Sequence, residues 1–218
     1  MARLLFEKTG KAIWISHLDL MRLFQRAFKR AGLPLKHTQG FNPRPSVSIA
    51  LPLSVGVESR CELLDFDLDG CDVPLDEITR KLNTALVDGV RVYETYASGC
   101  KLRDLSFLSC TVKLCYQAEA TEEMLQKVKD LFSRDSLPVM KKSKNGFVEQ
   151  DIIPLIRSIQ ITSQGNAIVL DAIIPCQNPS MNPMQLSQAI QTYLPDCATD
   201  LVTCCRNEIY DSNQNVFR

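Results

Sequence analysis

Apolar residues recur with helical spacing between residues 16 and 32. They follow one another at intervals of three or four residues: Leu20, Phe24, Ala27 and Ala31. This spacing places them on one side of a helix. Ser16 is a good N-cap, and Asp19 three residues later can complete a capping box. The pattern therefore predicts an amphipathic helix that begins after Ser16 and ends at Gly32.

Short apolar or alternating runs predict the strands around this helix. In the first half of the chain they lie at residues 3–8, 47–51, 61–68 and 90–96. A second helix is expected after Pro74. The resulting order, strand-helix-strand-strand-helix-strand, is that of the ferredoxin-like split unit.

The same order recurs from Thr111 onward. Strands are expected at residues 111–118, 153–162, 167–174 and 201–209, with helices that begin at Thr121 and at Asn182-Pro183. Leu33-Pro34-Leu35 is echoed by Leu137-Pro138-Val139, and Gly40-Phe41 by Gly146-Phe147. Chance similarity is the alternative for so short an echo. We expect an α+β protein with tandem ferredoxin-like (βαββαβ) domains and antiparallel sheets, covering residues 1–98 and 109–218.

Positive charge is concentrated at the start of the chain. The whole sequence has 25 basic and 25 acidic residues, but residues 1–60 carry ten basic and three acidic ones, and residues 61–218 carry the opposite excess. The outward side of the first predicted helix contains Arg22, Arg26, Lys29 and Arg30. Such a patch favours an anionic partner, with nucleic acid the first choice; the alternative is a solvated helix face.

The segment that follows this helix combines further cations with a stiff, aromatic loop. Lys36 precedes Gly40-Phe41-Asn42-Pro43-Arg44-Pro45, where the prolines restrict the backbone. Phe41 could stack on a base, Asn42 could bind a base edge and Arg44 a phosphate. The alternative is a buried Phe41 beside an ordinary turn. Lysines occupy the corresponding place in the second half, and we include them as candidate RNA contacts: Lys141, Lys142 and Lys144.

The chain contains only two histidines, His17 and His37, and both lie in this basic region. Together they could serve as acid and base in a metal-independent cleavage of RNA. The alternative is a structural role for each ring, through hydrogen bonds.

Nine cysteines occur without a C-x-x-C pair, so the spacing of a zinc or iron–sulfur site is absent. We expect most to be small buried hydrophobes, with a redox or metal role at Cys204-Cys205 as the alternative. No glycine-rich nucleotide loop is present, and we expect no cofactor or bound metal. The chain shows neither a signal-peptide core nor an apolar run of about 18 residues, which favours a cytoplasmic protein without a membrane partner.

Three motifs resemble the radical-SAM-linked protein family, a bacterial domain of unknown function that occurs alone or C-terminal to B12-binding radical SAM enzymes. They span residues 14–22, 26–34 and 40–45. The resemblance implies a radical SAM partner enzyme and a connection with RNA or translation, but no catalytic residue. The chain lacks the C-x-x-x-C-x-x-C motif of a radical SAM catalyst.

The leading hypothesis is therefore an RNA-binding accessory protein that acts with a radical SAM partner or on ribosome- or tRNA-linked RNA. An endoribonuclease that uses His17 and His37 is one alternative, and a protein-interaction adaptor is the other.

Overall fold

The computed structural model describes residues 1–143, 146–199 and 201–218. These residues form a mixed α+β structure with four α-helices and mostly antiparallel strands. The chain divides into two compact units. Unit 1 contains residues 1–104 together with Arg218, and unit 2 contains residues 105–217.

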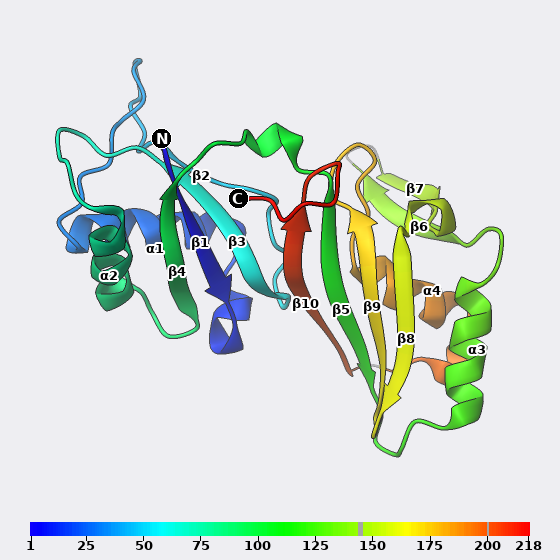
Figure 1. The fold of residues 1–218 in the computed structure, drawn as a ribbon. Coiled ribbons are helices and arrows are strands. Elements are labelled where there is room, and N and C mark those ends of the chain that lie inside the picture. Colours follow the sequence, from blue (N-terminus) through cyan, green and yellow to red (C-terminus); the bar gives the residue numbers. More distant parts are fainter. Residues whose placement is uncertain (144–145, 200) are drawn as a thin grey trace. The chain divides into compact units, whose positions relative to one another are not determined.

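Unit 1 is a four-stranded antiparallel sheet with two helices (Figure 1). In chain order its elements are β1 (Ala2–Lys8), α1 (His17–Arg30), β2 (Val47–Ile49), β3 (Glu58–Phe66), α2 (Leu75–Ala85) and β4 (Val90–Ala97). Within this unit the strands lie in the order β4-β1-β3-β2.

Unit 2 contains a sheet with the corresponding strand order and an additional hairpin. Its elements are β5 (Phe107–Cys115), α3 (Glu122–Phe132), β6 (Pro138–Ser143), β7 (Gly146–Asp151), β8 (Ser158–Gln164), β9 (Ala167–Pro175), α4 (Met184–Tyr193) and β10 (Leu201–Tyr210). The sheet order is β10-β5-β9-β8, and β6 pairs with β7 in a two-stranded sheet.

The predicted helices and sheet strands are confirmed, with shifts at several ends. β2 stops at Ile49 instead of residue 51, because Leu51 adopts a positive φ of 48° that a strand does not allow. β3 begins three residues earlier than expected, at Glu58. The β6–β7 hairpin was not predicted, because most of its residues are exposed and lack the alternation of a half-buried strand.

Phenylalanine pairs attach α1 to the sheet of unit 1. Phe24 contacts Phe6 of β1 with ring centroids 4.7 Å apart, and Phe28 contacts Phe66 of β3 at 4.8 Å. All four rings are buried. Burying an aromatic side chain contributes about 1.5–3 kcal/mol, so these pairs are a major part of the attachment.

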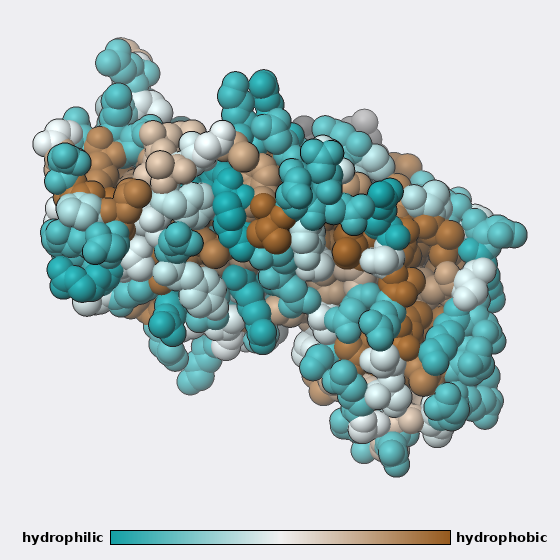
Figure 2. All heavy atoms as spheres, in the orientation of Figure 1, coloured by the Kyte–Doolittle hydropathy of each residue, from teal (hydrophilic) through white to brown (hydrophobic). Residues whose placement is uncertain are grey.

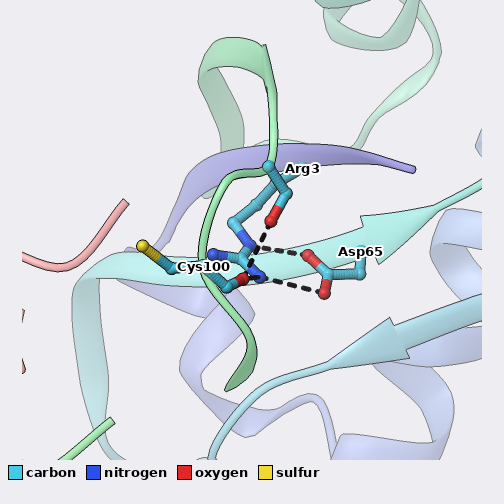
Figure 3. A network of polar contacts seen from close by, with 4 residues as sticks. Arg3, Asp65 and Cys100 are labelled. Atoms are coloured by element: carbon cyan, nitrogen blue, oxygen red, sulfur yellow. Dashed lines mark hydrogen bonds and ion pairs between the residues drawn. The ribbon is translucent and has the colours of Figure 1, made fainter. Parts of the chain in front are cut away.

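A buried ion pair crosses from β1 to β3 (Figure 3). Arg3 donates from Nε to Asp65 Oδ1 at 2.6 Å and from Nη2 to Asp65 Oδ2 at 3.0 Å. The same Nη2 also donates to the carbonyl oxygen of Cys100 at 3.0 Å. Burial alone would lower the pKa of Arg3, but the hydrogen bonds and charge of Asp65 outweigh it and raise the pKa above its usual value. The Arg3 guanidinium therefore stays charged.

Removing the carboxylate should strongly destabilise unit 1. Asp65→Ala leaves the buried guanidinium without its counter-charge, and we expect a loss of about 3–5 kcal/mol in the free energy of unfolding. Urea titration followed by circular dichroism measures it. The matched control is Asp67→Ala, because Asp67 forms a partly exposed ion pair with the N-terminal amine and should cost less than about 1 kcal/mol. Equal effects of the two substitutions would contradict this prediction.

Candidate nucleic-acid interface

The start of α1 is fixed by the predicted capping interaction. Ser16 Oγ accepts a hydrogen bond from the Asp19 backbone N–H at 3.2 Å and donates to Asp19 Oδ2 at 2.7 Å. Because Phe24 and Phe28 face the core, the polar side of the helix faces solvent. All four predicted cations are exposed there: Arg22, Arg26, Lys29 and Arg30.

Two of these cations have partners within unit 1. Arg22 Nη1 forms an ion pair with Asp19 Oδ1 at 2.9 Å, so one carboxylate lies beside the cations. Hydrogen bonds from Ser16 and Arg22 lower the pKa of Asp19, which keeps the carboxylate charged. Arg30 Nη2 donates to the backbone carbonyl of Ala85 at the end of α2. A neutral carbonyl leaves the charge of Arg30 available to an anion.

The segment from residue 36 to residue 46, here the 36–46 loop, projects from unit 1 between α1 and β2 (Figure 1). Its two sides pair like a short hairpin: Thr38 N–H donates to the Arg44 carbonyl at 2.8 Å, and Ser46 N–H donates to the Lys36 carbonyl at 2.7 Å. The Lys36 N–H in turn donates to the carbonyl of Asp67 at 2.8 Å. The base of the loop is thereby tied to the segment after β3.

The side chain of Phe41, midway along this loop, is fully exposed. It is therefore not part of the core, which settles the alternative left open by the sequence. Asn42 and Arg44 are exposed as well, and so is Lys36. In Figure 2 the projecting loop is mostly hydrophilic on the face that is drawn. The loop thus presents one aromatic ring among polar and basic groups.

The two histidines are held at opposite ends of α1. His17 is the first residue of the helix and is half-buried, whereas His37 is exposed in the 36–46 loop, beyond the other end. A helix of 14 residues is about 21 Å long. Acid and base on one phosphate must both lie within hydrogen-bond reach of it, so this placement does not support the ribonuclease alternative within a single chain.

Two of the three candidate lysines of unit 2, Lys141 and Lys142, lie on β6. Lys141 Nζ donates to the carbonyl and the hydroxyl of Ser180, so it anchors the hairpin. Lys142 is exposed. Lys144 lies outside the described residues.

The geometry of β10 does not support a redox or metal role for Cys204 and Cys205. Cys204 and Cys205 are neighbours on a strand, so their side chains point to opposite faces of the sheet. Burial raises the pKa of Cys204 to about 12, which keeps it a thiol, a poor nucleophile and metal ligand. Across the described ranges, no group of three or more His, Cys, Asp or Glu side chains is placed to hold a metal.

Two exposed apolar residues near the start of α1 were missed by the sequence analysis. Trp14 is 70% exposed and its ring lies over Gly56, while Leu18 is 66% exposed. Leu18 precedes Arg22 by four residues, so both lie on the same side of α1. The sequence did indicate Leu18, because this apolar residue lies outside the row of apolar positions that faces the core.

Comparison with known proteins gives a family match. The model of a family described as an uncharacterized protein conserved in bacteria (DUF2344) matches residues 2–187. No curated protein matches the chain. Among solved structures, an unknown protein from Galdieria sulphuraria is 11% identical over 96% of each chain, with a TM-score of 0.27. None of the helices in the described residues has the length and hydropathy needed to cross a membrane.

The exposure of Phe41 predicts that its ring does not contribute to stability. Phe41→Ala should change the free energy of unfolding by less than about 0.5 kcal/mol. Phe28→Ala, which removes a buried ring, should cost about 3–5 kcal/mol. Thermal or urea unfolding of the two variants provides the measurement. A large loss with Phe41→Ala would show that the loop packs on the core in solution.

Proposed function

The chain belongs to the DUF2344 family of uncharacterized bacterial proteins, and we propose that it is an RNA-binding accessory protein. The observation that carries the proposal is the combination of exposed cations on α1 with the fully exposed Phe41 on the loop that follows it. Both belong to the same unit. Neither is required by the core, which is built from the opposite side of α1.

The chemistry of this surface fits single-stranded or looped RNA. The cations of α1 would contact phosphates, which contributes affinity without sequence preference. Phe41 would stack on an unpaired base and Asn42 would bind its edge, and both need bases that are not closed in a duplex. Lys36 and Arg44 flank the ring in sequence and would hold the neighbouring phosphates.

The resemblance of residues 14–45 to radical-SAM-linked proteins supports a second part of the proposal, a radical SAM partner enzyme in the cytoplasm. The RNA would be linked to the ribosome or to tRNA. We also infer that both units are ferredoxin-like domains, joined between residues 98 and 109. The equivalent orders β4-β1-β3-β2 and β10-β5-β9-β8 support this inference.

Salt dependence tests the basic face. Six phosphate contacts on a single strand should give a log–log salt slope of about 4, because each contributes about 0.7. Replacing Arg22, Arg26, Lys29 and Arg30 by Gln should reduce the slope to about 1–2 and weaken binding to all sequences alike. Fluorescence anisotropy with labelled oligouridine measures both. Binding as tight as that of the wild type would contradict the proposal, and cleavage of RNA in EDTA would favour a nuclease.

Asp19 offers a test in the opposite direction. Asp19→Asn keeps a side chain that can cap the helix but removes the negative charge beside Arg22. RNA binding at low salt should become tighter by about 2- to 5-fold, as expected for one exposed charge of about 0.5–1 kcal/mol. Glu77→Gln on α2, where Glu77 pairs with Lys81, is the matched control and should leave the affinity unchanged. If Asp19→Asn binds RNA more weakly than the wild type, the Asp19 carboxylate does not oppose RNA binding and this prediction is wrong.

A further inference from the structure

An exposed phenylalanine occurs in unit 2 as well as in unit 1. All nine phenylalanines of the chain lie in the described residues, and six of them are buried. Phe107 is half-buried beneath Arg157. Only Phe41 and Phe147 are exposed, Phe147 by 71%.

The two exposed rings occupy corresponding places in the fold. Phe41 lies between the first helix of unit 1 and strand β2, and Phe147 lies between the first helix of unit 2 and strand β8. The sequence echo that precedes each ring has the same burial pattern. Leu33 and Leu137 are buried, and so are the residues two positions later, Leu35 and Val139. In both units the chain is thus anchored in the core immediately before it leaves as a hairpin.

The pairing of β6 with β7 places Phe147 beside a lysine. Phe147 is directly opposite Lys142, and Glu149 is opposite Met140. Directly paired residues share one face of an antiparallel ladder, and all four side chains are exposed. The other face contains the buried Val139. The outward face therefore carries an aromatic ring and a cation near one end and a carboxylate at the other.

Contacts with α4 hold this hairpin in place. The Gln188 side chain donates to the carbonyl of Met140 at 3.0 Å, and the Tyr193 hydroxyl donates to the carbonyl of Pro138 at 2.8 Å. Lys141 adds its bond to the Ser180 carbonyl. A ring presented by an anchored hairpin loses little conformational entropy when a ligand stacks on it.

We propose that the Phe147–Lys142 face is a second contact site for single-stranded RNA. Phe147 stacks on a base, Lys142 binds an adjacent phosphate, and Met140 extends the apolar surface. Glu149 repels phosphate, which confines the strand to the Phe147 end. This proposal rests on the proposed RNA-binding function, because it assigns to unit 2 the role proposed for the similar combination of exposed ring and cations in unit 1. The alternative is that this face binds a protein instead of RNA.

Crosslinking and substitution in the full-length chain test the site. Oligouridine that contains 4-thiouridine is irradiated with the wild-type protein, and crosslinked peptides are identified by mass spectrometry. We expect crosslinks in the peptides that hold Phe41 and Phe147. Phe147→Ala should weaken binding by about 5- to 100-fold and remove the second crosslink. Phe147→Trp should retain both. Val148→Ala is the matched control, because Val148 is an exposed neighbour on the opposite face.

The outcomes separate this site from the proposed function. If RNA binds and crosslinks only near Phe41, and Phe147→Ala binds as tightly as the wild type, the second site is wrong and the proposed function stands. If the wild type binds no oligouridine at low salt, both are wrong. If Phe147→Ala keeps its RNA affinity but loses a protein that co-purifies with the wild type, the hairpin is a protein-docking surface instead.

Discussion

The packing of Phe24 and Phe28 on the sheet is the constraint on which the candidate interface depends. These two side chains contact Phe6 and Phe66, which fixes the rotation of α1 about its own axis. Successive side chains are 100° apart around a helix. Fixing the direction of Phe24 and Phe28 therefore also fixes the direction of the side chains on the opposite side of α1. The outward cations are therefore held in place by a core that they do not contact. The end of α1 is set by Gly32, whose φ is 69°.

Each unit presents an exposed phenylalanine, but the backbone support differs. The loop around Phe41 has two cross-bridging backbone hydrogen bonds and a bond from the Arg44 N–H to the Thr38 hydroxyl. Phe147 instead lies on a regular ladder anchored to α4. Leaving such a ring in water forgoes about 1.5–3 kcal/mol of burial. An exposed phenylalanine at corresponding places of both units favours a common role for the two rings over chance exposure.

The sequence predicts the parts of the fold that have a buried side. α1 and α3 are identified by apolar periodicity and by caps at Ser16 and Thr121, and both caps are present. The β6–β7 hairpin could not be predicted in this way, because its stability comes from backbone pairing and from bonds with α4 that are distant in sequence. The helix predicted after Ser16 lies between His17 and His37, so the placement of these residues at its two ends could also be predicted from the sequence. The ion pair between Asp19 and Arg22 was detectable, since the two are three residues apart.

Burial divides the positive charge of unit 1 into two groups with different roles. Arg3 is fully buried and paired with Asp65. Lys8 is also buried, donates to the carbonyl of Ile13 at 3.1 Å, and has a pKa lowered by desolvation. These cations serve the fold and cannot reach a phosphate. The excess of basic over acidic residues in residues 1–60 therefore overstates the positive charge available to RNA. That charge would come from the exposed cations of α1 and from Lys36 and Arg44, and Asp19 reduces it at the start of the helix. A moderate salt slope, rather than the steep one of a uniformly basic protein, follows from this division.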